Sequence, residues 1–581
     1  MVNLQKPKRF NTLHPNWRFS TPLIRNNNDD RSYTLHEEEA QVYRLPSLRF
    51  SPMVTPQRQW WEEIATYRSH VNKEDDDSDT RSRSDDDEPL PPPFMGAQGE
   101  QGDTSYDPLR QAEDDPDVVT WDGDDDPANP LNWPRKKKWT ATILVSSFTF
   151  ISPIASTMIA PSLEEIGEDF DIESDMKRAF VMSIFLLAYA IGPFILGPLS
   201  EIFGRVVVLQ STNLIFLVFN TMCGFSRNTN EILAYRFISG LGGSAPQALG
   251  GGVLSDCWRT EERGKAVAVY SLAPFIGPAV GPIVGGIMTQ YTSWRWVFWV
   301  VSLADLVVQA MATLYLPETY APALLAKKAK KLRKQTGNKN LRTKWQNPEH
   351  SMVHILRKNL VRPFIMLGTQ PAIQVMALYR AFLYGLMYLV FSTYALVWEE
   401  DYDQSLTISS LNYISLGIGF VTGLQICAPL MDRIYNRLKK KYNHPGKPEF
   451  RVPLMLPGGL LVPLGMALYG WSAHYRLHWI FPNIGVGIFA CGLIIGFQCA
   501  QSYVVDSYTR YAASATGAAA FLRTMAGFSF PLFAPAMYDA MGLHWGNTML
   551  AIISLIMGVA APIFLWYRGE WLRSKSTYCA G

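Results

Sequence analysis

After residue 135 the sequence is a series of long apolar runs separated by short polar pieces. Stretches of about 18 or more mostly apolar residues are long enough to cross a bilayer, and they exceed what a soluble core helix needs. We count about twelve such runs, so the sequence predicts an all-α membrane protein with twelve transmembrane helices. The approximate ranges are 139–161, 179–200, 206–225, 231–254, 265–289, 296–316, 369–397, 408–430, 452–472, 478–503, 513–538 and 547–567.

Basic residues near the ends of these runs indicate how the chain is oriented in the membrane. A lysine cluster at 136–138 precedes the first run, and further basic residues occupy 327–334 between the sixth and seventh runs. The loops at 399–407 and 539–546, on the other side, contain neither Lys nor Arg. Because positively charged loops stay in the cytoplasm, we expect both termini and the middle loop there, in a multi-pass protein of the plasma membrane.

Changes in composition divide the chain into five expected parts. The first is polar and includes an acidic block at 74–88, so we expect a disordered cytoplasmic tail that buries too little apolar surface to fold. Two six-helix bundles follow, joined by a cytoplasmic linker, and a short cytoplasmic tail ends the chain. The expected boundaries are 1–135, 136–316, 317–365, 366–570 and 571–581.

The linker contains a basic segment at 321–336, APALLAKKAKKLRKQT, in which three leucines alternate with many lysines. Such a pattern is typical of an amphipathic helix that lies on an anionic membrane surface. A basic linker without that role fits the composition equally well, and the sequence leaves both interpretations open.

The fifth run contains an unusual repeat of small and rigid residues: Gly277, Pro278, Gly281, Pro282, Gly285 and Gly286. In a soluble helix each interior Gly would cost about 1 kcal/mol and each Pro about 3 kcal/mol. In a membrane, glycines spaced four apart let a neighbouring helix approach closely. The prolines free backbone carbonyl groups, which a packed neighbour, a hydroxyl or a water can satisfy.

The two halves of the chain share weak sequence echoes at corresponding places. Pro198–Glu201 (PLSE) follows the second run, and Pro429–Asp432 (PLMD) follows the eighth. Asp256 follows the fourth run, and Asp506 follows the tenth. Two parallel six-span repeats around a midplane site are a known transporter plan.

Four segments carry a resemblance to the major facilitator superfamily, specifically to its twelve-span drug:proton antiporter branch that is common in fungi. They are 126–133 (DPANPLNW), 197–205 (GPLSEIFGR), 236–240 (RFISG) and 277–286. The resemblance implies the major facilitator fold, with two pseudo-symmetric bundles. It also implies proton-coupled export of small organic molecules, such as drugs, toxins or polyamines, by alternating access.

We expect no enzymatic activity, because no nucleophile motif or His/Cys/carboxylate cluster is present, and no cofactor or metal. No GxxxxGK[ST] loop is present, so ATP is not expected to drive transport. The expected partners are a small-molecule substrate, protons and the lipid bilayer, with no nucleic acid, and the protein is expected to be a monomer.

The family's signature between spans two and three implies a gating latch that holds the cytoplasmic side closed in the outward-facing state: Gly197, Glu201, Gly204 and Arg205. The glycines would allow tight turning and close helix approach, and Glu201 would cap a nearby helix. Arg205 would pair with an acid across the cytoplasmic mouth. Glu201 replaces the usual Asp, while Ile202 and Val206 stand where basic residues are common, so this latch carries less charge.

Ionisable residues inside the runs are candidates for the proton and substrate pathway, because a charge in the bilayer is costly without a cavity or partner. The resemblance implies such a role for Arg236, which could alternatively extend to water at the outer membrane surface. Asp305 in the sixth run is a candidate protonation site. Arg380 could mark a substrate preference or pair with an acid such as Asp305.

The family fold places spans one, four, seven and ten around a central cavity. Their polar and aromatic residues are our candidates for substrate contact: Ser152, Thr157, Gln247, Tyr384, Tyr388, Asn483, Gln498 and Tyr503. Aromatic residues in membrane helices also serve as packing or interfacial anchors. The family further implies that the span-five glycines press against a helix of the second half.

Two other functions remain open at this point. A proton symporter or facilitator of the same fold could import a nutrient, although the repeat at 277–286 favours antiport. A transporter-like sensor could signal through the long N-terminal tail.

Overall fold

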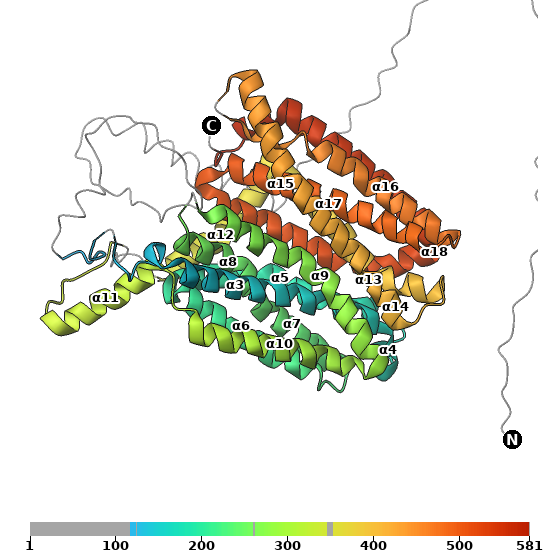
Figure 1. The fold of residues 1–581 in the computed structure, drawn as a ribbon, viewed down its shortest axis with the longest axis horizontal. Helices are drawn as coiled ribbons and strands as arrows, with labels where there is room; N and C mark the ends of the chain where they lie inside the picture. Colours follow the sequence, from blue (N-terminus) through green and yellow to red (C-terminus); the bar gives the residue numbers. More distant parts are fainter. Residues whose placement is uncertain (1–116, 124, 260–261, 345–351, 445, 580–581) are drawn as a thin grey trace, which may run out of the picture. The chain divides into compact units, whose positions relative to one another are not determined.

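The computed structural model describes residues 117–123, 125–259, 262–344, 352–444 and 446–579 (Figure 1). Most of the predicted disordered tail lies outside these described residues. Within them the fold is helical, and the β-structure is one isolated bridge between Val118 and Arg342. This confirms the predicted fold class.

The first half consists of helices that cross back and forth in chain order. They are α3 (Arg135–Thr157), α4 (Leu163–Asp169), α5 (Asp175–Phe203), α6 (Arg205–Cys223), α7 (Thr229–Gly243), α8 (Ala245–Cys257), α9 (Arg263–Tyr291) and α10 (Trp294–Tyr315).

The linker contributes α11 (Ala321–Thr336) and α12 (Met352–Thr369). The second half repeats the pattern of long helices. They are α13 (Pro371–Glu400), α14 (Leu406–Leu411), α15 (Ile414–Tyr442), α16 (Met455–His474), α17 (Ile480–Ser507) and α18 (Ala512–Ser574). Four 3-10 turns complete the described elements: η1 (Pro130–Asn132), η2 (Ala160–Ser162), η3 (Pro448–Arg451) and η4 (Thr509–Tyr511).

Ten helices in the described part of the chain are long and apolar enough to cross a membrane. The fourth expected span is absent from that number because α7 and α8 are separate helices that meet at Ser244, where Pro246 lies in the first turn of α8. The eleventh and twelfth spans are both contained in α18. Adding α7–α8 and dividing α18 in two gives the twelve expected spans.

The division of α18 lies at Gly542, whose φ of 72° and ψ of 162° are not helical. This backbone region is essentially restricted to glycine, because a Cβ atom would clash with the backbone. The chain therefore reverses between spans eleven and twelve with almost no intervening loop.

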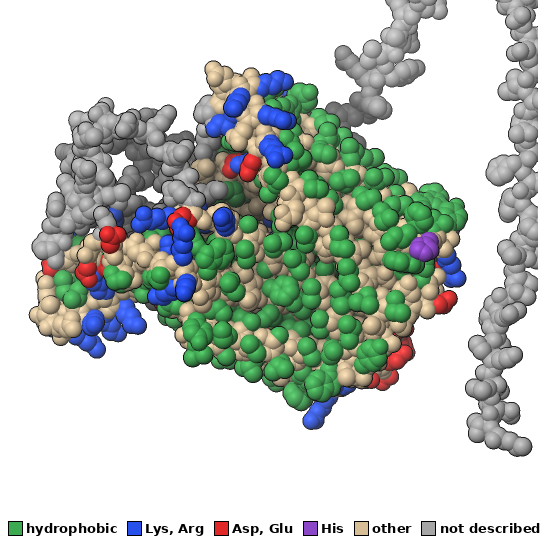
Figure 2. Space-filling view, viewed as in Figure 1, with side chains coloured by type: hydrophobic (Ala, Val, Ile, Leu, Met, Phe, Trp, Pro, Cys, Tyr) green, Lys and Arg blue, Asp and Glu red, His purple; other side chains and the backbone are tan. Residues whose placement is uncertain are grey.

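Helix α11 coincides with the basic segment of the linker and projects from one end of the helical bundle (Figure 1). Its Leu325 and Ala329 are buried. Lys328 Nζ lies 2.6 Å from Asp122 Oδ1 and donates to the carbonyl of Thr120 at 2.9 Å. One face of α11 thus packs within the protein, while its other lysines form part of a strongly basic surface (Figure 2).

We expect Gly542→Ala to destabilise the protein by about 1–3 kcal/mol, because alanine would be strained in this backbone conformation. The thermal unfolding midpoint of the purified protein in detergent measures the effect. Gly517→Ala is the matched control, since it lies in the same helix and a Cβ there meets nothing within 4 Å. Equal midpoints for the two variants would contradict the assignment of a strained turn.

Candidate functional site

Hydrogen bonds join the two halves of the chain toward the ends of their helices that are remote from the lysine clusters. Ser156 of α3 and Tyr388 of α13 share a hydrogen bond of 2.9 Å between their hydroxyl oxygens. The backbone N–H of Thr407, in α14, donates to Oε1 of Gln290, in α9, at 2.6 Å. A Cβ on Gly286 would overlap Ser410, so α9 and α14 are in close contact there.

Toward their lysine-rich ends, α9 and α15 diverge (Figure 1). Figure 2 shows a hollow on this face between the basic end of α15 and the end of the first half that carries 136–138. On this face the structure is therefore closed at one membrane end and open at the lysine-rich end.

The glycines of α9 pack against α3 in their own half, which corrects the expectation that they press against the second half. A Cβ on Gly277 would lie 2.8 Å from the carbonyl oxygen of Phe150, and one on Gly281 would lie 2.8 Å from that of Ile154. A Cβ on Gly285 would overlap the carbonyl oxygen of Met158. Residues spaced by four share one helix face, whereas Gly286 is rotated by about 100° and is the member of the motif that meets the second half.

As predicted from the sequence, a proline of the motif leaves a backbone carbonyl group free to accept a hydrogen bond from a neighbouring helix. Pro282 has no N–H, so it cannot bond to the carbonyl of Pro278 four residues earlier. The Thr157 hydroxyl of α3 donates to that carbonyl oxygen at 3.1 Å. Thr157, a cavity candidate from the sequence, is buried in this helix contact.

The expected latch forms a cluster around the start of α6. Arg205 Nε lies 2.6 Å from Asp256 Oδ2, at the end of α8. Glu318, which the sequence analysis did not identify, accepts hydrogen bonds from the backbone N–H groups of Arg205 at 3.0 Å and Val206 at 3.2 Å. Its carboxylate thereby caps the positive end of α6, and all of these partners belong to the first half.

The remaining latch residues have different surroundings. Gly204, with φ of 99°, joins α5 to α6, and a Cβ there would lie 2.5 Å from the Glu318 carboxylate. Gly197 is a helical residue of α5, and a Cβ there would meet nothing within 4 Å. Close approach of another helix therefore does not require a glycine at this position. Glu201 is exposed, and its negative charge disfavours deprotonation of Tyr320. Burial, the larger effect, and this charge together raise the pKa of Tyr320 to about 12.

The second half contains a counterpart of this cluster at the positions that the sequence echoes indicated. Arg451 Nε lies 2.9 Å from Asp506, and its Nη1 lies 3.1 Å from Asp432. Arg573 and the buried Glu449 form a further ion pair at 2.9 Å. In this conformation the pairs join helices of the same half, and the expected latch across the cytoplasmic mouth stays a prediction for the outward-facing state.

Arg236 in α7 is completely buried, so it does not extend to water at the membrane surface. Its guanidinium donates to the carbonyl oxygens of Ala155 at 2.8 Å and Met182 at 3.2 Å. It also lies over the Phe185 ring at 4.8 Å. Arg236 thus joins α7 to α3 and α5 close to the Ser156–Tyr388 contact.

Asp305 is also completely buried, but it lies between α6 and α10. Asn213 Nδ2 donates to its carboxylate at 2.9 and 3.1 Å, and to Gln309 at 3.1 Å. The same two helices are joined by Asn220, which donates to Ser302 at 2.9 Å. The polar contacts described for Asp305 are made by Asn213, so the expected pairing of Asp305 with Arg380 is not found.

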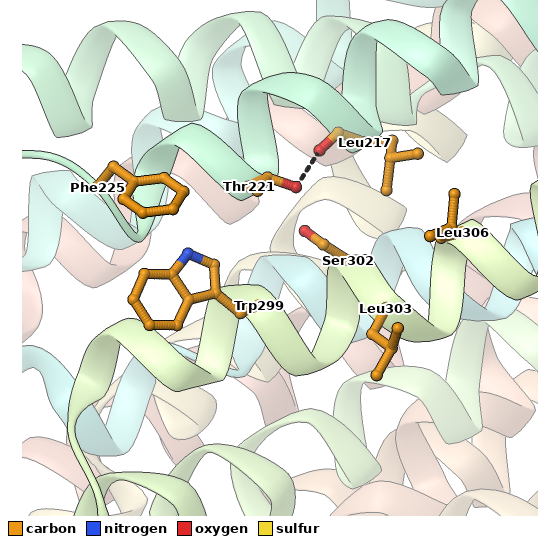
Figure 3. A pocket seen from close by; sticks show the side chains of 7 residues that line it. All are labelled: Leu217, Thr221, Phe225, Trp299, Ser302, Leu303 and Leu306. Carbon is orange, nitrogen blue, oxygen red and sulfur yellow. Dashed lines mark hydrogen bonds between the residues drawn. The ribbon is translucent and has the colours of Figure 1, made fainter.

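A groove of about 440 Å³ lies beside this polar interface of α6 and α10 (Figure 3). It is largely apolar, and Figure 3 shows Thr221 bonded to the backbone of Leu217 at its edge. Its lining residues are Leu217, Thr221, Phe225, Trp299, Ser302, Leu303 and Leu306. Our cavity candidates from the sequence lie on other helices.

The predicted cavity residues divide into a central group and others with their own local contacts. Tyr384 and Tyr388 pack at 4.9 Å, measured between ring centroids, and Tyr384 lies 6.2 Å from Phe497 of α17. Phe275 of α9 approaches Phe497 at 5.9 Å, so rings from both halves meet there. Phe497 could not be predicted from the sequence, because nothing in a long apolar run distinguishes one phenylalanine from the others.

Asn483 lies nearer the closed end, where it accepts a hydrogen bond from Tyr394 at 3.0 Å and donates to Asn412 at 2.8 Å. Ser152 is buried and bonds to its own helix. Gln247 and Gln498 are partly exposed, in α8 and α17, whereas Tyr503 is buried in α17.

Comparisons with known proteins give a consistent family assignment. The model of the Major Facilitator Superfamily matches residues 145–531. Efflux pump vrtL of Penicillium aethiopicum is 45% identical over 472 residues, which cover 81% of this chain and 93% of that protein. Efflux pump radE of Floropilus chiversii is 42% identical over 470 residues, which cover 81% and 87%.

Solved structures share the fold at low sequence identity. The xylose transporter XylE from E. coli, in a partially occluded inward-open conformation, is 16% identical with a TM-score of 0.55; the match covers 74% of this chain and 98% of that one. A bacterial homologue of the human lysosomal transporter Spinster is 13% identical with a TM-score of 0.55, covering 76% and 99%.

We expect Gly281→Leu to separate α9 from α3, because its side chain would occupy the space of Thr157 and the Ile154 carbonyl. Overpacking of this kind costs about 1–3 kcal/mol. A lowered thermal midpoint with unchanged insertion into membranes is the expected result. Gly264→Leu, at the exposed start of the same helix where a Cβ meets nothing within 4 Å, should leave the midpoint unchanged.

Proposed function

The chain belongs to the major facilitator superfamily and is a transmembrane transporter, and we propose that it exports small organic molecules in exchange for protons. The two fungal relatives named above, vrtL and radE, are efflux pumps rather than enzymes. Drugs, toxins and polyamines are the substrate classes that the sequence resemblance implies. We further propose that it acts as a monomer in the plasma membrane.

The observation that carries this proposal is that the polar contacts between the halves gather at one membrane end, whereas nearer the other end α5 and α18 pack through rings such as Phe194 and Phe521, at 5.6 Å. Ser156–Tyr388 and Gln290–Thr407 join them at one membrane end, while α9 and α15 diverge toward the other. Alternating access requires such a closure at one end at a time. The first half is held together by contacts of its own, including Thr157–Pro278 and Arg205–Asp256. These support movement of 136–316 and 366–570 as two bodies.

We propose that the lysine-rich end, both termini and the linker at 317–365 lie in the cytoplasm, in accordance with the distribution of basic residues. The structure would then be open toward the cytoplasm. In the outward-facing state, the Arg205–Asp256 and Arg451–Asp506 clusters would approach one another and act as the gating latch.

Export can be tested after a panel of toxic compounds has been compared in strains that lack or overproduce the protein. A compound to which overproduction confers resistance is then supplied to inside-out membrane vesicles. We expect an acidic lumen to drive its accumulation and a protonophore to abolish that accumulation. Accumulation driven only by an acidic exterior would indicate symport, and equilibration that ignores the gradient would indicate a facilitator.

Asp305 and Arg236 are our candidates for the proton and substrate pathway. The variant Asp305→Asn tests whether Asp305 couples proton movement to substrate transport. If Asp305 carries the coupled proton, the variant should still exchange substrate across vesicles but should no longer accumulate it against a gradient. Ser302→Ala removes an uncharged contact of the same two helices and serves as the control. Full accumulation by Asp305→Asn would remove Asp305 from the pathway.

A further inference from the structure

Two arginines of the second half converge on one aromatic ring at the centre of the protein. The guanidinium carbon of Arg380, in α13, lies 4.4 Å from the centroid of the Phe497 ring. That of Arg523, in α18, lies 5.6 Å from the same centroid and 4.7 Å from that of Tyr384. Three different helices, α13, α17 and α18, therefore place two positive charges around Phe497.

These charges have few polar contacts. Arg380 is only 2% exposed, and within the described residues its Nε and Nη1 have no hydrogen-bond partner. Arg523 Nε is likewise buried without one. Because both guanidinium groups lie against the Phe497 ring, two like charges face each other there and repel.

The aromatic contacts offset only part of the cost of these buried charges. A cation over an aromatic ring gains about 0.5–2 kcal/mol, whereas a buried unpaired charge costs several kcal/mol. Arg236 provides a comparison inside the same protein, because its guanidinium is bonded to three backbone carbonyls. Within the described part of the chain, Nε and Nη1 of Arg380 and Nε of Arg523 lack such bonds, as expected for groups that bind a ligand.

The pair lies where the two halves face each other. Arg523 is partly exposed and close enough to act electrostatically on Tyr189 of α5 and Tyr270 of α9, both in the first half. Phe275 of α9 completes an aromatic wall with Phe497 and Tyr384. A ligand between the halves would therefore meet positive charge and flat apolar surfaces together.

We propose that Arg380 and Arg523 form the binding site for the anionic group of the transported molecule, an organic anion in which a carboxylate adjoins an aromatic body. The guanidinium groups supply paired donors of the geometry that carboxylates accept, and the rings of Phe275, Tyr384 and Phe497 pack against the body. This inference rests on the proposed export function and selects acidic compounds over polyamines and other cations.

Three probes with the same naphthalene body test the charge requirement: 1-naphthoate, 1-naphthamide and 1-naphthylmethylammonium. Their binding to the purified full-length protein is measured by isothermal titration calorimetry. We expect 1-naphthoate to bind at least about tenfold more tightly than the other two probes. A tenfold difference in affinity corresponds to about one hydrogen bond to a charged group. Equal or tighter binding of the ammonium compound would overturn the proposal.

Arg380→Gln and Arg523→Gln should each weaken 1-naphthoate binding by about ten- to a hundredfold. Both variants should retain or increase the thermal midpoint of the ligand-free protein, because each removes one of two charges that repel each other. Arg568→Gln, an exposed arginine of α18, is the control for net charge and should bind as the wild type does. A loss of midpoint with unchanged affinity would show that the arginines are structural, against the proposal.

Competition with sodium benzoate and with sodium sulfate distinguishes an organic anion from an inorganic one. Displacement by benzoate alone supports the site, and displacement by sulfate alone contradicts it.

The vesicle assay keeps this inference separate from the proposed function. Proton-driven export of neutral or cationic compounds without 1-naphthoate binding would reject only the anion site, whereas 1-naphthoate binding without any proton-driven flux would reject only proton antiport.

Discussion

The close contact between α3 and α9 determines how the first half of the protein is built. Three glycines bring the two backbones together, and the Thr157 hydroxyl satisfies a carbonyl that Pro282 leaves without its helical partner. In a bilayer no water is available at this depth to satisfy that group. The neighbouring Ser156 bonds instead to Tyr388 of the second half. Two adjacent residues of one helix therefore serve different purposes: Thr157 maintains the bundle, while Ser156 takes part in a contact that alternating access must break.

The charged groups at the lysine-rich end follow the same division. Arg205 with Asp256, and Arg451 with Asp432 and Asp506, each join helices of one half. Such partly buried pairs restrict the geometry of their own bundle, whatever their net contribution to stability. Because each cluster is complete within its half, the halves can separate at this end without leaving a buried charge unpaired.

Much of the fold followed from sequence because lipid imposes simple requirements on length and polarity. Run length predicted the spans, and the Gly/Pro repeat predicted both close packing and a hydroxyl bonded to a freed carbonyl. The predicted partner helix of the span-five glycines was wrong, because their spacing determines which residues share a helix face but not which helix packs against that face. Glu318 was missed for a related reason, since it follows span six in sequence but caps span three. The pairing of Arg380 with Asp305 failed because two opposite charges in a sequence carry no information on distance. The sequence did not indicate that Arg380 and Arg523 lie together. Their proximity follows from the packing of α13, α17 and α18, which brings both side chains beside Phe497.

The turn at Gly542 has a consequence for how the protein responds to its surroundings. Since almost no loop separates them, spans eleven and twelve are coupled mechanically. The first of these packs on α5 of the opposite half, where Phe528 and Phe180 lie 6.0 Å apart. The second carries Ile552 and Ile556, which are 54% and 61% exposed and face lipid. A tilt at the interface between halves must then displace acyl chains around span twelve. Because bilayer thickness acts on helix tilt at a cost of a fraction of a kcal/mol per Å, we expect it to influence the balance between inward- and outward-facing states.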